Sequence, residues 1–121
     1  MQKVLIIEDH ADMRELLSWQ LELMGFTPIL AKHGKEGIEK ALAEKPELIL
    51  MDIMMPGMDG YAAIHEIRGR DAFRRLPIIA LTAKAMKGDR QKCLDAGASD
   101  YIAKPVDMDQ LLSLLRVWLY R

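Results

Sequence analysis

Five polar side chains stand at the carboxyl ends of strand-length apolar runs in this sequence. Glu8 and Asp9 follow the first run, Asp52 closes the third, Thr82 follows the fourth and Lys104 follows the fifth. In an open parallel sheet such ends lie at one edge, where ligands bind. Three carboxylates close together raise one another's pKa, so they stay ionised at neutral pH only if a cation offsets their charge.

Phosphoryl transfer assisted by Mg²⁺ is the chemistry that fits this set. Asp52 precedes three bulky apolar residues, so its charge must be paired or bound to metal. Mg²⁺ prefers one or two carboxylates together with a phosphate. Lys104 offers a positive charge to a phosphoryl oxygen and Thr82 offers a hydrogen-bond donor. The set therefore contains a nucleophile, a metal site and two phosphoryl anchors, as in-line transfer requires.

The elements that must position these residues alternate along the chain. Between the apolar runs lie segments of helical length and period, which predicts five strands and five helices in alternation. Parallel strands need crossover helices on both faces of a buried sheet. Pro28 favours an edge position for the second strand. We predict an α/β, doubly wound, flavodoxin-like sheet of order 2-1-3-4-5, with strands at Lys3 to Ile7, Phe26 to Ala31, Leu48 to Met51, Pro77 to Leu81 and Asp100 to Ala103.

Helix punctuation and composition agree with one compact unit. Gly25 and Gly97 stand where helices should end in a left-handed residue, and Asp107 can cap the last helix. The 121 residues and the last helix at the chain end predict one domain, residues 1–121. Net charge is −1, which gives no support to binding of nucleic acid or membrane. The single Cys93 and the absence of a long apolar run favour the cytoplasm.

Four motifs resemble the receiver domains of two-component response regulators, namely VLIIEDH, LILMDIMMPGMDG, IIALTA and DAGASDYIAKPV. The resemblance covers nearly the whole chain. It implies a phosphorylation-operated switch that accepts a phosphoryl group from a histidine kinase or histidine phosphotransfer protein. At the matching positions it implies Asp52 as phosphoacceptor, an acidic pair, a Mg²⁺ site and phosphoryl contacts: Glu8, Asp9, Asp52 and the Met54 carbonyl for the metal, and Thr82 and Lys104 for the phosphoryl group.

The same resemblance implies that Tyr101 is an aromatic whose rotamer follows phosphorylation. From the residues alone, the favoured interpretation of Tyr101 is an edge-strand aromatic with its hydroxyl in water. Lys104-Pro105 resembles a cis peptide bond of the family, a minority state for such bonds in general. The sequence leaves the state of that bond open.

The first and last helices carry more apolar residues than one buried face needs, which indicates surfaces for partners. The surplus residues are Trp19 and Leu23 in the first helix and Leu114 and Trp118 in the last. The resemblance implies that the first helix meets the kinase or phosphotransfer helix. It also implies that helix 4, strand 5 and helix 5 meet a downstream target or a second copy. The basic fourth-helix region, with Lys84 and Lys92, is either a solvated face or part of that surface.

Two other classes of protein fit the sequence less well. A phosphatase of the haloacid-dehalogenase type needs a second acid two residues after its nucleophile, where Met54 stands. A nucleotide-binding module needs a glycine-rich loop after the first strand. We therefore expect a phosphoacceptor that catalyses only its own phosphorylation and slow dephosphorylation. The resemblance to receiver domains implies that Met54 and Lys84 border the path by which water reaches the acyl phosphate. The three histidines are expected to be cap or surface residues. Cys93 is expected to be a half-buried structural thiol.

Overall fold

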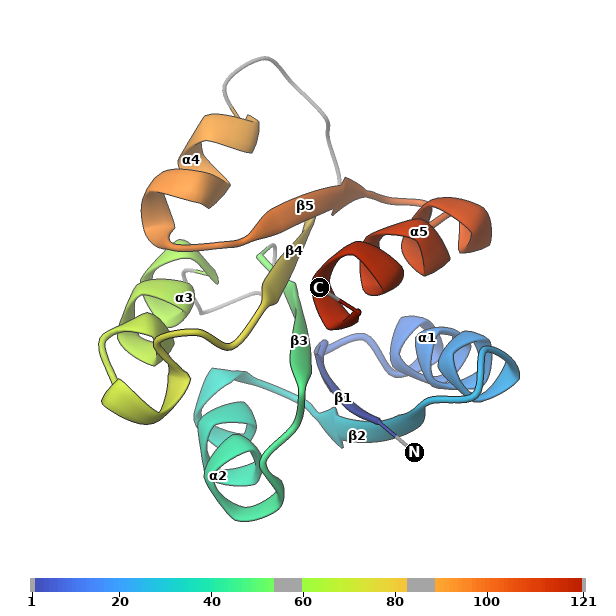
Figure 1. Ribbon diagram of the computed structural model, residues 1–121, viewed down its shortest axis with the longest axis horizontal. Helices are drawn as coiled ribbons and strands as arrows, with labels where there is room; N and C mark the ends of the chain where they lie inside the picture. Colours follow the sequence, from blue (N-terminus) through green and yellow to red (C-terminus); the bar gives the residue numbers. More distant parts are fainter. Residues whose placement is uncertain (1, 54–59, 83–88, 121) are drawn as a thin grey trace.

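Five parallel strands form one sheet with helices on both faces (Figure 1). The computed structural model describes residues 2–53, 60–82 and 89–120, without the side chains of residues 89 and 90. The strand order β2-β1-β3-β4-β5 confirms the predicted sheet. The elements are β1 (Lys3–Ile7), α1 (Ala11–Leu23), β2 (Thr27–Ala31), α2 (Gly34–Glu44), β3 (Leu48–Asp52), α3 (Gly60–Arg68), η1 (Asp71–Phe73), β4 (Ile78–Thr82), α4 (Asp89–Ala96), β5 (Asp100–Ala103) and α5 (Met108–Leu119).

Two hydrophobic clusters, one on each face of the sheet, hold these layers together. Side chains alternate between the faces of a strand, so Leu5 and Ile7 join one cluster while Val4 and Ile6 join the other. The first cluster lies under α2, α3 and α4, and the second under α1 and α5 (Figure 1). Burial on both faces explains why the central strands read as unbroken apolar runs.

The strand ends differ slightly from the sequence expectation. β3 and β4 each run one residue further than predicted, so Asp52 and Thr82 are the last residues of their strands. Asp52 lies opposite Leu81 in the parallel ladder. The ladder therefore fixes the backbone of both polar residues. Pro28 lies in β2, which is an edge strand as predicted.

The predicted helix boundaries are confirmed. Gly25 and Gly97 have φ values of 90° and 115°, a left-handed conformation that costs glycine little. The side chain of Asp107 accepts a hydrogen bond of 3.0 Å from the backbone N–H of Gln110 and caps α5. His10 and His33 are caps as well, at the starts of α1 and α2.

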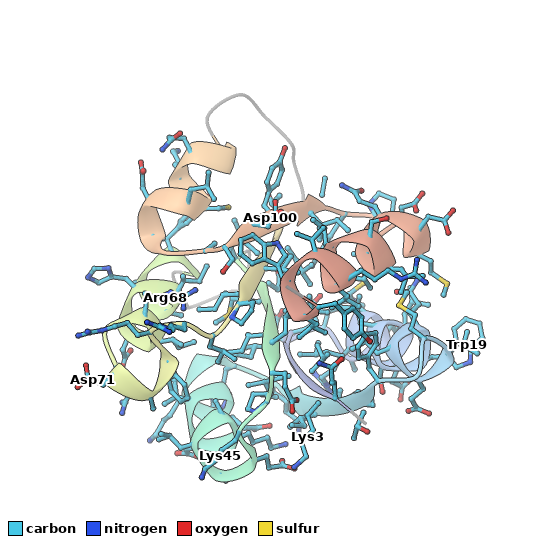
Figure 2. All side chains as sticks on the ribbon, in the orientation of Figure 1. Lys3, Trp19, Lys45, Arg68, Asp71 and Asp100 are labelled. Carbon is cyan, nitrogen blue, oxygen red and sulfur yellow. The ribbon has the colours of Figure 1, made fainter. Side chains whose placement is uncertain are left out.

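Two expectations about burial were wrong. Cys93 is fully buried in the cluster beneath α2, α3 and α4, because its helix face packs directly on the sheet. Leu114 and Trp118 are not surplus surface either, since both pack against the cluster beneath α1 and α5. Trp19 and Leu23 are 58% and 60% exposed, and Figure 2 shows Trp19 projecting outward from α1.

Arg68 joins the end of α3 to the segments on either side of β4. Its guanidinium donates to the carbonyls of Gly97, Phe73 and Leu76 at 3.0, 2.8 and 2.7 Å. Charge-assisted bonds of this kind are among the stronger hydrogen bonds in proteins. Within the described ranges, no helix has the length and apolar character needed to cross a membrane.

Candidate functional site

The predicted polar residues meet at the carboxyl edge of the sheet. β1 pairs with β3, and β3 with β4, so their last residues lie side by side. Glu8 is fully buried, and Asp52 and Thr82 are each 2% exposed. Asp9 is exposed, although it is the direct neighbour of Glu8. The site is thus a buried floor with one acidic residue at its solvent rim.

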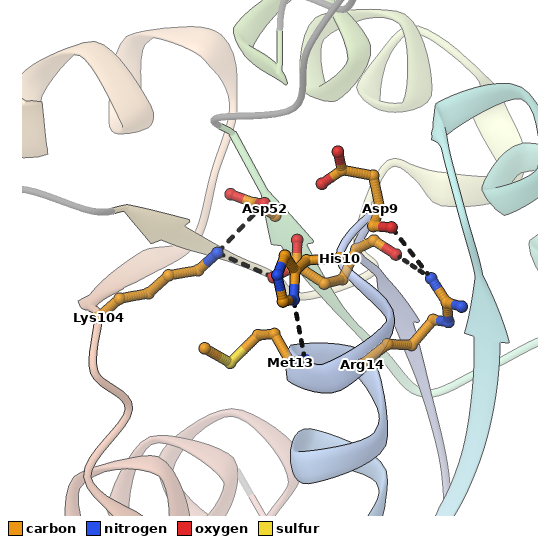
Figure 3. Close-up of polar contacts among 7 residues, drawn as sticks. Asp9, His10, Met13, Arg14, Asp52 and Lys104 are labelled. Atoms are coloured by element: carbon orange, nitrogen blue, oxygen red, sulfur yellow. Dashed lines mark hydrogen bonds and ion pairs between the residues drawn. The ribbon is translucent and has the colours of Figure 1, made fainter.

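Three carboxylates form a compact oxygen cluster at this edge. Glu8, Asp9 and Asp52 each offer an oxygen within 4.8 Å of the others (Figure 3). The second oxygen of Glu8, Oε2, is buried and accepts no hydrogen bond from the described residues. Hard oxygen ligands with unused acceptor capacity fit a hard divalent cation, so this donor set suits Mg²⁺.

Lys104 reaches this cluster from the far side of β4. Its backbone N–H donates to the Thr82 carbonyl at 2.7 Å, which ties the end of β5 to the end of β4. The ammonium Nζ lies 2.9 Å from Glu8 Oε1 and 3.2 Å from Asp52 Oδ2 (Figure 3). One positive charge therefore bridges the two buried carboxylates. The Lys104-Pro105 peptide bond that follows this residue is cis.

Burial and neighbouring charges shift the pKa values of Glu8 and Lys104. Desolvation, and then the close Asp52 carboxylate, raise the pKa of Glu8 to about 7 against the opposing effect of Lys104. Burial alone would lower the pKa of Lys104, but the Glu8 and Asp52 carboxylates together raise it above its ordinary value. Near neutral pH, Glu8 is therefore partly protonated, while Lys104 stays charged.

The remaining predicted residues lie on neighbouring strands or outside the described chain. Thr82 is buried at the end of β4. Tyr101, on β5, lies opposite Ala80 of β4. Its side chain is half-buried and packs against the cluster beneath α2, α3 and α4. The Met54 carbonyl and Lys84 lie outside the described residues.

Two residues that shape the site were not predicted from the sequence. Arg14 Nη1 donates to the carbonyls of Glu8 and Asp9 at 2.9 and 3.4 Å, which steadies the backbone of the acidic pair (Figure 3). Gly60 begins α3 directly against the strand end, since a Cβ there would lie 2.3 Å from the Cα of Ile53. An arginine in an amphipathic helix gives no sequence signal of such a contact. For Gly60, the only signal is a glycine near an expected turn.

Comparison with known proteins identifies a family. The family model described as response regulator receiver domain matches residues 4–116. The response regulator ArlR of Staphylococcus saprophyticus is 38% identical over 121 residues, which cover 100% of this chain and 54% of that protein. An uncharacterized 14.6 kDa protein of Leptolyngbya boryana is 39% identical over 113 residues, 93% of this chain and 86% of that protein. The chain spans about half the length of most of the relatives that it matches.

Solved structures give the same result. The receiver domain of a sensor histidine kinase from Pseudomonas aeruginosa, crystallised with a magnesium ion in its active-site cleft, has a TM-score of 0.90 and 38% identity, covering 99% of this chain and 98% of that one. A response regulator from Chloroflexus aurantiacus has a TM-score of 0.93 and 29% identity, with coverage of 99% and 98%. This chain therefore belongs to the receiver domains of the response regulator family.

Proposed function

We propose that residues 1–121 form one receiver domain in which Asp52 accepts a phosphoryl group from a phosphohistidine partner, in a two-component or phosphorelay pathway. The observation that carries this proposal is the meeting of the Glu8, Asp9 and Asp52 oxygens within 4.8 Å, with the Lys104 ammonium beside them. A metal and a lysine together offset the charge that would otherwise repel an incoming phosphate.

The transfer forms one bond and breaks one bond. A carboxylate oxygen of Asp52 attacks phosphorus, the phosphorus–nitrogen bond of the phosphohistidine breaks, and its electron pair returns to the imidazole, which takes up a proton. Bound Mg²⁺ supplies charge neutralisation, and Glu8, Asp9, Asp52 and the Met54 carbonyl would hold it. Lys104 and Thr82 would engage the phosphoryl oxygens. The same residues would catalyse slow dephosphorylation, with no separate substrate turned over.

The first prediction is that phosphorylation from acetyl phosphate requires Mg²⁺. Without the metal, the acidic cluster repels the dianionic donor, so we expect labelling in EDTA to fall to the background of an unreactive surface carboxylate. Intact-mass measurement after incubation with and without Mg²⁺ checks this. Equal labelling in EDTA would contradict the role of the carboxylate cluster as a metal site.

The second prediction is that Mg²⁺ affinity falls as pH falls. The raised pKa of Glu8, about 7, means that a proton competes with the metal below that value. Displacement of one proton makes the affinity about tenfold lower at pH 6 than at pH 8, with little change above pH 8. Titration calorimetry at the two pH values measures this. Glu8→Gln should remove the pH dependence, and a dependence that persists in Glu8→Gln would assign it to another group.

We further propose that Thr82 and Tyr101 carry the switch. The end of β4 lies between Asp52 on β3 and the end of β5, where Thr82 pairs with Ala103. A phosphoryl group on Asp52 would draw the Thr82 hydroxyl inward and change the space available to Tyr101.

The third prediction is that Thr82→Ala is phosphorylated but switches poorly. The variant keeps the nucleophile and the metal cluster, so we expect labelling by acetyl phosphate to persist. The change in the NMR signals of Tyr101 on phosphorylation should fall to less than about half that of the wild type, since the linking hydrogen bond is lost. Equal changes in both proteins would remove Thr82 from the mechanism.

Partner surfaces follow from exposure. We propose that the exposed α1 stripe of Leu16, Trp19 and Leu23 meets a helix of the kinase or phosphotransfer protein. We also propose that α4, β5 and α5 meet a downstream target or a second copy. A net charge of −1 favours protein partners over nucleic acid or membrane, and a cytoplasmic location fits the single buried thiol.

A further inference from the structure

Helix α5 is attached at both of its ends to the strand that carries Tyr101. Its amino end follows β5 through Lys104, whose ammonium binds Glu8 and Asp52. At its carboxyl end, the indole Nε1 of Trp118 donates a hydrogen bond of 3.3 Å to Asp100 Oδ2. Asp100, which is labelled in Figure 2, is the first residue of β5. Trp118 lies in the last turn of α5. The helix therefore spans from the charged site to the opposite end of the strand.

The Asp100 carboxylate binds two elements at once. Its Oδ1 accepts the backbone N–H of Tyr101 at 2.8 Å, while Oδ2 accepts the indole of Trp118. The carboxylate therefore cannot turn to follow the Tyr101 backbone without moving Oδ2 relative to the indole. This shared carboxylate connects the backbone of the proposed switch residue to the end of α5.

The two hydrogen bonds differ in their tolerance of movement. Protein N–H···O bonds have donor–acceptor distances of about 2.7 to 3.2 Å, so the indole bond, at 3.3 Å, is slightly longer than this range. The bond to Tyr101 joins neighbouring residues and moves with the strand. A shift of β5 by a few tenths of an ångström away from α5 therefore breaks the Trp118 bond first.

We propose that the Asp100–Trp118 hydrogen bond belongs to the arrangement in which Lys104 binds Glu8 and Asp52, and that it opens when a phosphoryl group on Asp52 engages Lys104. This inference rests on the proposed function. Lys104 is four residues from Asp100 in the same segment, so movement of its ammonium away from Glu8 is transmitted along β5. The last turn of α5, where Val117 is exposed, then becomes a regulated surface.

A bond present in only one of two arrangements biases the equilibrium between them. Trp118→Phe keeps the aromatic ring in the cluster beneath α1 and α5 but removes the donor. We expect this variant to bind beryllofluoride with Mg²⁺, a mimic of the acyl phosphate, at least about threefold more tightly than the wild type. Asp100→Ala should also tighten binding, because it removes the Trp118 bond together with the bond to the Tyr101 N–H. Addition of Trp118→Phe to Asp100→Ala should cause no further change, because the bond that the two residues share is already lost.

Titration calorimetry on the full chain measures these affinities, with Tyr120→Phe as the matched control. Tyr120 follows α5 directly, and its side chain is 65% exposed, so removal of its hydroxyl should leave the affinity unchanged. Wild-type or weaker affinity in Trp118→Phe overturns the inference. In that case, the proposed function still stands if beryllofluoride binds to the wild type and this binding is lost in Asp52→Ala. Failure of the wild type to bind beryllofluoride overturns both.

A fluorescence measurement decides the matter if Trp118→Phe does not fold, as judged by circular dichroism. The chain has two tryptophans, so Trp19→Phe leaves Trp118 as the only indole. Beryllofluoride with Mg²⁺ should then shift the emission of Trp118, because its N–H loses the carboxylate partner. Unchanged emission under conditions that saturate the site would overturn the inference.

Discussion

Asp52→Asn is expected to abolish phosphorylation by acetyl phosphate. The substitution preserves size but replaces the nucleophilic carboxylate with a neutral amide, and it removes one negative charge from the oxygen cluster. We expect initial labelling rates to fall by at least about a hundredfold. Intact-mass measurement in the presence of Mg²⁺, followed by peptide mapping of the wild type, checks both the loss and the position.

Asp12→Asn is the matched control for this experiment. Asp12 is an exposed aspartate in the first turn of α1, outside the oxygen cluster, so its loss should leave labelling unchanged. Labelling of Asp52→Asn at the wild-type rate would show that another carboxylate, such as Asp9 at the rim, accepts the phosphoryl group.

Lys104→Met is expected to have the largest effect on stability and to make stability strongly dependent on pH. The substitution leaves Glu8 and Asp52 buried without their bridging cation. Removal of one partner from a buried ion pair typically costs several kcal/mol, and we expect a loss of about 2 to 4 kcal/mol at pH 8. Lys104 also opposes Mg²⁺ electrostatically, so the variant should bind the metal more tightly while it retains a phosphoryl group less well.

The sign of the pH dependence follows from Glu8. Its pKa in the folded protein, about 7, lies above the ordinary value of 4.5, and loss of Lys104 raises it further. A carboxyl group with a raised pKa stabilises the fold below its ordinary pKa, and that contribution is lost as pH rises through the folded value. Lys104→Met should therefore recover most of its stability between pH 8 and pH 5.

Chemical denaturation at pH 5 and pH 8 measures this change, with Lys92→Met as control. Lys92 is exposed on α4, so its loss should change the free energy of unfolding by less than about 0.5 kcal/mol at either pH. The double variant Glu8→Gln/Lys104→Met should lose less stability at pH 8 than the single variant. A loss independent of pH in Lys104→Met would assign the effect to side-chain packing.

Much of the fold was predictable because its determinants are local. Two-sided burial makes the interiors of β1, β3 and β4 apolar, and Pro28 excludes β2 from the centre of the sheet. Gly25 and Gly97 mark helix ends because few other residues adopt a positive φ. Strand order and alternation follow from these signals together with the rules of parallel sheets.

The convergence of the site was predictable for a related reason. Parallel strands end at the same edge, so polar residues at those ends meet whatever the details of packing. Glu8, Asp52 and Lys104 lie together as expected. The residue types at those ends indicated phosphoryl transfer assisted by Mg²⁺, and the family motifs then implied a role for each residue.

Burial of individual side chains was not predictable from the sequence. Glu8 and Asp9 are adjacent and chemically alike, yet one is fully buried and the other exposed. Leu114 and Trp118 were expected to be surplus from the helical period, but both pack, partly buried, against the cluster beneath α1 and α5. Such outcomes depend on neighbours far along the chain, which a local pattern does not contain.

The sequence by itself thus determined the order of elements, the edge where the site lies, and the residues that meet there. Only the tertiary structure decided the electrostatic state of the site and its connection to α5. The raised pKa of Glu8 and the bridging of two carboxylates by Lys104 require distances across three strands. The hydrogen bond from Trp118 to Asp100 likewise joins residues whose approach is set by helix packing on the sheet. Local propensity acts over a few residues, whereas Coulomb energy and desolvation depend on where the whole chain places each charge.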